Sequence, residues 1–301
     1  MLKKAYSWHR PLMLFTLSMI VLTPIAALGI LLDDRMLVDS PIWFKPFKFA
    51  VSFVLYSASL AWFISLLEGR ARKIAWWIGT VATVVSVGEM VIIVGQVIRG
   101  KRSHFNFETP LDTALFSAMG TMVMILWVSN LILAVMLFRK RFDDPAKGWT
   151  IRLSLLIALV GMGVGFIMTQ PRPGQDMAKG VLGSHSIGGP DGGSYMALTG
   201  WSTVHGDLRI GHFIGMHALQ VLPLLIALAG RWANARLAWV ISGGYLGITL
   251  LTIWQALRGQ PLVKPDALTL GVAAAIVVAT ALGVVWARQT PKNTKKEYAL
   301  A

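Results

Sequence analysis

Long apolar runs separated by short polar segments dominate the hydrophobic pattern of this chain. Each run is about 20 residues long, the length that an α-helix needs to cross a hydrocarbon layer of about 30 Å. The pattern therefore predicts an all-α, polytopic membrane protein with eight transmembrane helices. The predicted spans are 11–32, 48–67, 74–98, 113–138, 151–169, 210–229, 237–257 and 267–287.

The composition supports contact with a lipid bilayer. Hydrophobic residues make up 55% of the 301 positions and charged residues only 14%, and the mean hydropathy is +0.63. A soluble domain carries about 25% charged residues. The sequence also has no cysteine, which excludes disulfides, thiolate metal sites and a cysteine nucleophile.

Basic residues predict the orientation in the membrane. They are concentrated in segments that alternate along the chain, and the positive-inside rule places such segments in the cytoplasm. Both termini are therefore predicted to be cytoplasmic, and the membrane is predicted to be the cytoplasmic (inner) membrane. The formal net charge of +14 then indicates attraction to anionic lipid and not to nucleic acid. The first span begins like a signal peptide, but its long apolar run predicts an uncleaved anchor. The basic segments are 3–10, 70–73, 139–152, 231–236 and 288–296.

Glu89 is the most informative residue within a predicted span. It lies ~15 Å below Arg99 at the span boundary, which is close to the middle of the membrane. Gln96 lies on nearly the same face of the helix. Ionisable groups in a membrane are costly, so two interpretations stay open. Glu89 is a neutral structural residue hydrogen-bonded to a neighbouring helix, or it is a ligand, a proton carrier or a cation-binding residue.

We interpret the stretch 199–230 as the centre of the chain's organisation, and it begins as a polar loop and becomes an apolar helix. His212 and His217 are about 140° apart around that helix, so they cannot chelate one metal from an undistorted helix. His217 shares a face with Gln220, and Pro223 is expected to bend the helix. His217 matches Glu89 in depth. We therefore predict that Glu89 and His217 are within direct or one-water reach, in a cavity open to the outer surface.

The candidate site has a cavity and a rim. The predicted cavity residues are Glu89, Gln96, His212, His217 and Gln220. The predicted rim residues are Arg99, His104, Asp207, Arg209 and Arg258. His104 is either an interfacial side chain or a ligand. Lys45 and Lys48 either extend outward to the membrane surface or form a cationic rim for an anionic ligand.

The longest segment outside the predicted spans is the glycine-rich outer loop 170–209. Its run from Ser184 to Gly193 brings serine, histidine and aspartate together, as in a hydrolase. The strand-turn-helix elbow that such a nucleophile needs is absent, however. We expect an unstructured loop or a flexible lid over the site.

Two short motifs indicate an internal repeat. Gln96 to Gly100 and Gln255 to Gly259 both read Gln-x-x-Arg-Gly, and each is followed by a short loop with a Pro/Asp helix start. This pattern predicts two parallel four-helix halves, 1–140 and 141–301. Asp112 is predicted to be the N-cap of the fourth span. The fifth span carries Gly161, Gly163 and Gly165, which favour close approach of another helix.

Four blocks of the sequence resemble a family of bacterial eight-span integral membrane proteins, and this resemblance implies the architecture but no activity. They are PIWFKPFKF (41–49), GQVIRGKRSHFN (95–106), GDLRIGHFIGMHALQVLP (206–223) and WQALRGQPL (254–262). The architecture also resembles that of haem A synthase, with eight spans in two parallel halves and histidines toward the outer face. In that family paired histidines from four helices bind haem, whereas here only the sixth span carries histidine.

Three functions follow from these observations. The first is metal- or haem-dependent redox chemistry or cofactor handling, with His212, His217 and Glu89 as candidate metal ligands, because imidazole is the commonest metal ligand. The second is proton-coupled transport, with Glu89 as the proton carrier. The third is a structural, sensory or assembly role. A small-molecule ligand or ion is expected in the first two, and the oligomeric state stays open.

Overall fold

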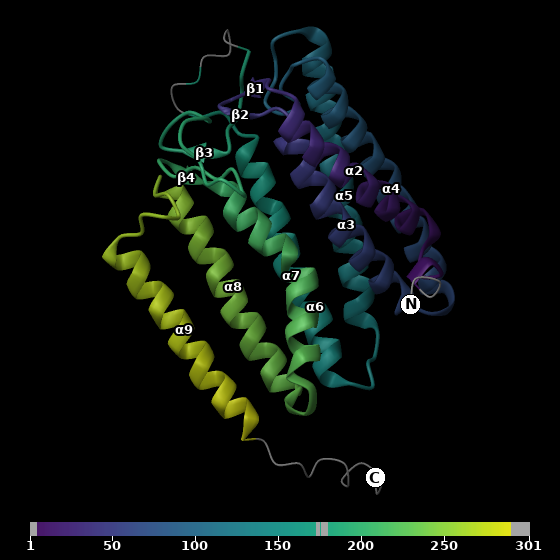
Figure 1. Cartoon of the computed structure of the whole chain (residues 1–301). Helices are drawn as coiled ribbons and strands as arrows, with labels where there is room; N and C mark the ends of the chain where they lie inside the picture. Colours follow the sequence, from purple (N-terminus) through teal and green to yellow (C-terminus); the bar gives the residue numbers. More distant parts are fainter. Residues whose placement is uncertain (1–4, 173–174, 176–179, 290–301) are drawn as a thin grey trace, which may run out of the picture.

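The computed structural model describes residues 5–172, 175 and 180–289, and these form a bundle of membrane-length helices (Figure 1). The eight long helices of this described part are each long and apolar enough to cross a membrane. The prediction of an all-α, multi-pass membrane protein is therefore confirmed. The helices are α2 (Arg10–Leu32), α3 (Phe44–Ser65), α4 (Gly69–Ile98), α5 (Pro110–Arg139), α6 (Pro145–Met168), α7 (Leu208–Ala229), α8 (Ala235–Leu257) and α9 (Ala267–Arg288).

Helix starts are set by side-chain caps, and these correct two predicted boundaries. In α6, Asp144 accepts hydrogen bonds from the backbone N–H groups of Ala146 and Lys147, so this helix starts several residues earlier than predicted. In α5 the N-cap is Thr109, not Asp112. Asp112 lies in the first turn, where its backbone N–H donates to the Thr109 hydroxyl and its carboxylate accepts from it.

Glycines allow α6 and α7 to approach until their backbones touch. A Cβ atom built on Gly215 would lie 2.5 Å from the Cα of Gly161. A Cβ atom built on Gly211 would overlap the side chain of Ile253 in α8, so α7 packs closely against two neighbouring helices. Gly165 faces His212, whereas a Cβ on Gly163 would meet nothing within 4 Å. Of the predicted small-residue stripe, Gly161 makes the close helix contact.

The short strands all lie at one end of the bundle, among the connecting loops (Figure 1). β1 (Met36–Leu37) and β2 (Ser40–Pro41) form a hairpin between α2 and α3. β3 (Ser186–Ile187) pairs antiparallel with β4 (Gly206–Asp207), and β4 leads directly into α7. The described part of loop 170–209 is thus folded and paired, which corrects the expectation of an unstructured segment.

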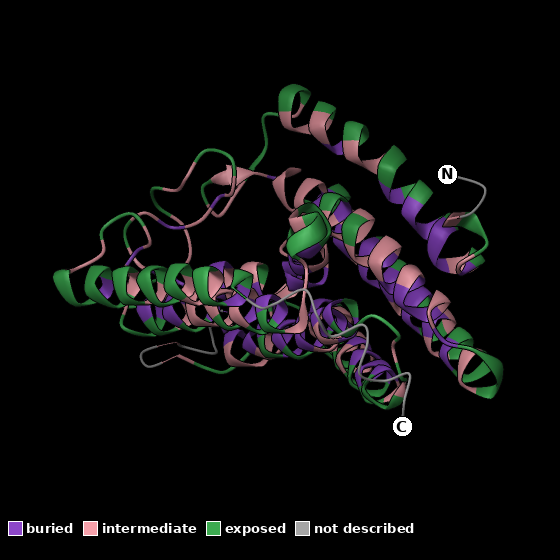
Figure 2. Ribbon diagram, turned by 90° about the horizontal axis from the view of Figure 1, so that it is seen from below, coloured by how far each residue is buried: buried purple, intermediate pink, exposed green. Residues whose placement is uncertain are grey.

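Exposed residues lie along the outer faces of the helices, and buried residues line the faces turned toward one another (Figure 2). Large apolar side chains such as Leu32, Val84, Leu228 and Leu282 are among the exposed ones. Contiguous apolar surface of this extent would be unfavourable in water but is suited to hydrocarbon. The outer surface of the bundle therefore contacts the lipid bilayer.

Candidate functional site

The functional candidate is a cavity of about 350 Å³ at the end of the bundle that carries the strands. Its walls come from α3, α4, α5, α6 and α7, and its roof comes from the loops 37–42, 101–105 and 185–202. Aromatic side chains, including Phe49, Phe53, Trp201 and Phe213, form much of the wall. Among the described residues, four histidines, three lysines and two arginines supply most of its titratable groups.

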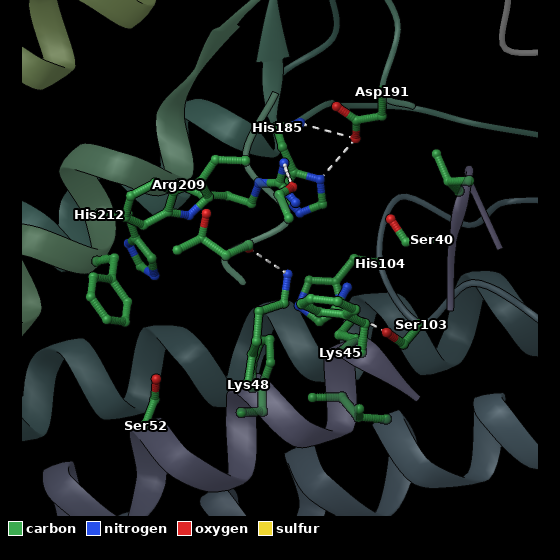
Figure 3. Close-up of a pocket in the computed structure, with 18 of the residues that line it drawn as sticks. Ser40, Lys45, Lys48, Ser52, Ser103, His104, His185, Asp191, Arg209 and His212 are labelled. Carbon is green, nitrogen blue, oxygen red and sulfur yellow. Dashed lines mark hydrogen bonds and ion pairs between the residues drawn. The ribbon is translucent and has the colours of Figure 1, made fainter. Parts of the chain in front are cut away.

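His212 is positioned by the glycine crossing of α6 and α7. Because the two backbones touch there, the Nδ1 atom of His212 reaches the carbonyl oxygen of Gly161 at 2.8 Å. A carbonyl oxygen only accepts hydrogen bonds, so Nδ1 carries the proton. The Nε2 atom is left with its lone pair, and the ring lines the cavity (Figure 3).

His217 lies deeper in the cavity wall, one to two turns along α7. Its Nδ1 atom is 3.0 Å from Oε1 of Gln220. The amide nitrogen of Gln220 donates to the Leu55 carbonyl and to the Ser59 hydroxyl, which fixes Oε1 as an acceptor. Nδ1 of His217 is therefore protonated, and its buried Nε2 makes no hydrogen bond with the described residues.

His185 comes from the glycine-rich loop and is oriented by Asp191. Its Nδ1 atom donates to Asp191 Oδ2 at 2.8 Å. The same carboxylate also accepts from the Ser184 hydroxyl and from the backbone N–H groups of His185 and Ser186. Asp191 thus fixes the tautomer of His185 and leaves its Nε2 with a lone pair. Serine, histidine and aspartate do meet in this run, but Ser184 donates to Asp191 and is not placed as a nucleophile on His185.

His104 completes the group, from the loop between α4 and α5. Its Nδ1 atom is 3.1 Å from the Ser103 hydroxyl. The next residue, Phe105, is buried and has φ +60, a left-handed conformation that costs a residue other than glycine about 1–2 kcal/mol. In that conformation its ring packs 6.1 Å from the ring of His104 and 4.8 Å from that of His185.

The two loop histidines are neutral at pH 7. Burial lowers the pKa of His104 well below its ordinary value, and the positive charge of Lys45 lowers it further. Burial also lowers the pKa of His185, although the Asp191 carboxylate opposes this. For Asp191 itself, burial raises the pKa, but the interactions with His185 and Ser184 outweigh this and lower it. The roof thus presents neutral imidazoles and one ionised carboxylate.

Lys45 and Lys48 turn into the cavity and do not extend outward along the lipid surface (Figure 3). The ammonium group of Lys48 donates to the Thr199 carbonyl at 3.1 Å. That bond ties α3 to the roof. Arg209, at the start of α7, lines the same space and forms an ion pair with the buried Asp207. The structure therefore favours the interpretation of Lys45 and Lys48 as a cationic rim.

Several predicted site residues lie outside the cavity lining. Gln96 is buried and donates to the Arg102 carbonyl and to Asp112, while Arg99 forms an ion pair with Asp112. Arg258 forms an ion pair with Asp266. These groups hold the turns after α4 and α8. Asp207 caps α7, so of the predicted rim only His104 and Arg209 line the cavity.

Glu89 and His217 are not hydrogen-bonded to each other. Both carboxylate oxygens of Glu89 are buried without a hydrogen-bond partner in the described part of the chain, and so is Nε2 of His217. Glu89 lies one helical turn from Ile93, which lines the cavity, but Glu89 does not line it. Among the described residues, no three histidine or carboxylate side chains are close enough to hold one metal ion. The predicted ligands His212, His217 and Glu89 are therefore not gathered into one group in this structure.

Sequence reasoning missed His185 and Asp191 as cavity residues. The available signal was a histidine and an aspartate in a loop that carries many glycines, since folded loops over a rigid scaffold often carry functional groups. Comparison with protein families, with curated proteins and with solved structures found no match.

Proposed function

We propose that this membrane protein binds a haem-type cofactor in the cavity and uses or transfers it there. The proposal rests on the observation that three histidines, His185, His212 and His217, line one cavity. In each of them Nδ1 donates a hydrogen bond and Nε2 keeps its lone pair. Hydrogen bonds that fix Nδ1 in this way are typical of histidines that ligate a metal through Nε2.

The geometry favours a metal inside an organic macrocycle over a bare ion. A bare transition-metal ion needs three or more ligands from the chain, and the described residues offer no such group. A haem macrocycle supplies four ring nitrogens itself, so the chain has to supply only one or two axial ligands. The aromatic side chains of Phe49, Phe53, Trp201 and Phe213 provide apolar walls for a flat ring system. When bound, the iron supplies one-electron or oxygen chemistry.

The test is haem binding by the purified, folded protein. We expect added haemin to give a shifted Soret band, and we expect His185→Ala, His212→Ala or His217→Ala to change or remove it. His205→Ala is the matched control, because His205 does not line the cavity. A folded protein whose spectrum with haemin equals that of free haemin contradicts the proposal, and so does a spectrum that none of the three variants alters.

The same proposal places the cavity on the outer side of a bacterial inner membrane. The support is the distribution of basic residues, because the turns at the opposite end of the bundle carry the lysine- and arginine-rich segments. A reporter fused after residue 147 is expected in the cytoplasm, and one inserted at Gly192 is expected outside. The reverse pattern contradicts the orientation.

Proton-coupled transport is a second candidate, favoured by Glu89. A carboxyl group that is 1% exposed, lies one turn from a cavity and has no hydrogen-bond partner among the described residues is suited to carry a proton. Proteoliposomes with a pH gradient and an internal pH dye test this. We expect a proton flux in the wild type that Glu89→Gln abolishes, since glutamine keeps the shape but does not titrate. Equal fluxes in the two proteins exclude this role.

A further inference from the structure

We propose that Lys45 and Lys48 form a subsite for the carboxylates of the bound ligand, so that the cavity selects an aromatic or apolar molecule carrying anionic groups at one end. This inference rests on the proposed function, since it assigns the part of the same cavity that holds the acidic edge of a haem-type ligand. It specifies that the ligand carries carboxylates, which the histidines alone do not indicate.

The two lysines form no ion pair with an acidic side chain among the described residues. Both side chains are only partly exposed. Lys48 donates one hydrogen bond, to the Thr199 carbonyl, and Lys45 packs 5.9 Å from the ring of Phe49. An ammonium group has three donors, so both lysines keep unused donors beside the cavity. Partly buried charges without a counterion are costly unless a ligand supplies one.

The remaining charges of the cavity do not neutralise them. Among the described residues its lining holds one carboxylate, Asp191, which is already engaged by His185, Ser184 and two backbone N–H groups. Arg209 lines the cavity as well and is neutralised by Asp207. Lys45 and Lys48 are one helical turn apart on α3, so their ammonium groups act on the same region. The unbalanced charge at this wall is positive and suits one or two carboxylates.

The apolar surroundings restrict the ligand further. Phe44 packs against Lys48, with 4.7 Å between the ammonium nitrogen and the ring centroid, and Phe49 and Phe53 continue along the same helix into the cavity. A small hydrated anion gains nothing from these rings, whereas an amphiphile buries its apolar body against them. Figure 3 shows the two lysines entering from α3, across from His185 and His212. A ligand that spans this space meets lysine at one edge and imidazole at the other.

The test uses metal-free protoporphyrin IX, a dicarboxylate that cannot be ligated through iron, and its dimethyl ester. We expect the wild type in detergent to bind the diacid at least tenfold more tightly than the ester, measured by fluorescence. We expect the double variant Lys45→Gln, Lys48→Gln to bind the diacid at least tenfold more weakly than the wild type does. Its affinity for the ester should stay within twofold of the wild-type value. Lys264→Gln is the control, because this exposed lysine lies at the same end of the bundle outside the cavity.

The outcomes separate the two proposals. Equal affinity for diacid and ester, or an unchanged affinity in the double lysine variant, overturns the subsite even if haemin still binds through histidine. Lysine-dependent binding of the diacid, together with a haemin spectrum that no histidine variant alters, keeps the subsite and overturns haem ligation. Each variant is checked by its thermal unfolding, so that a loss of folding is not read as a loss of binding.

Discussion

The turns that hold Gln96 and Gln255 differ from the cavity in how completely their polar groups are paired. Gln96 donates to the carbonyl six residues later, and Gln255 does the same. Arg99 and Arg258 each form an ion pair with an aspartate near the start of the next helix. In the cavity, by contrast, Nε2 of His217 and the ammonium group of Lys45 have no hydrogen-bond partner among the described residues.

This difference separates groups that hold the fold from groups that are available to a ligand. A polar side chain that is paired with other groups of the turn stabilises the turn that it spans, and removing it leaves its partners unsatisfied. A side chain with one polar atom hydrogen-bonded and another without a partner is held in position and can still bind a ligand. The predicted rim residues Arg99 and Arg258 belong to the first kind, and His212 belongs to the second.

The largest expected effect tests this separation directly. Asp112 is fully buried and accepts hydrogen bonds from Gln96, Arg99 and Thr109. Asp112→Ala is expected to lower the free energy of unfolding by about 3 kcal/mol, because a buried amide and a capping hydroxyl lose their partner. His212→Ala should lower the free energy of unfolding by clearly less. Denaturant titration in detergent measures both, and equal losses would contradict the difference between groups that hold the fold and groups that are available to a ligand.

The next effect concerns the crossing that holds the Gly161 carbonyl against His212. Gly215→Ala is expected to destabilise the protein by about 2 kcal/mol, since its Cβ would lie 2.5 Å from the Cα of Gly161. Gly163→Ala is the matched control. Its Cβ meets nothing within 4 Å, and alanine is the better helix former, so this variant should be neutral or slightly stabilising. Thermal unfolding of the two variants compares them, and similar losses would contradict the close contact.

A smaller effect follows from the neutral histidines of the roof. The folded protein holds the pKa of His104 and of His185 below the ordinary value of 6.5. Below pH 6.5 the unfolded chain therefore binds protons that the folded protein does not bind. Acid should therefore lower the free energy of unfolding, by up to about 1.4 kcal/mol per pH unit for each histidine. His104→Gln should show a shallower loss between pH 7 and pH 5. Parallel curves for the variant and the wild type would argue against a buried neutral His104.

The smallest expected effect is a difference in stability between variants of the two turns. Arg99 faces a buried aspartate, whereas Arg258 and Asp266 are both substantially exposed. Exposed ion pairs contribute little because water and salt screen them. Arg258→Gln is thus expected to shift the unfolding midpoint less than Arg99→Gln does, and added salt should weaken its effect further. A larger shift for Arg258→Gln would show that the second turn is the more important.

The spans were predictable because the length and polarity of a hydrophobic run depend on the local sequence alone. The close approach at Gly161 was predictable for the same reason. The partners across the bundle were not. The sequence predicts a similar depth for Glu89 and His217, but depth says nothing about which way each side chain faces around the bundle.

The lysines of α3 show the same limit. Long side chains near a helix end generally extend to the membrane surface, and only the folded roof turns Lys48 inward, through the Thr199 carbonyl. His185 and Asp191 were missed because a glycine-rich segment carries no periodicity. Their placement depends on the pairing of β3 with β4 and on the hydrogen bonds that Asp191 accepts.

The roof of the cavity is fastened from several sides, and this has a consequence for rates. The backbone N–H of Gly193 donates to Asp39 of the first hairpin, Asn106 forms a β-bridge with Val181, and Lys48 holds Thr199. These contacts join the roof loops to the first hairpin, to the loop between α4 and α5, and to α3. Loops that cover a site commonly set how fast a ligand enters and leaves it. We therefore expect weakening of these contacts to change the rates of ligand exchange more than the affinity.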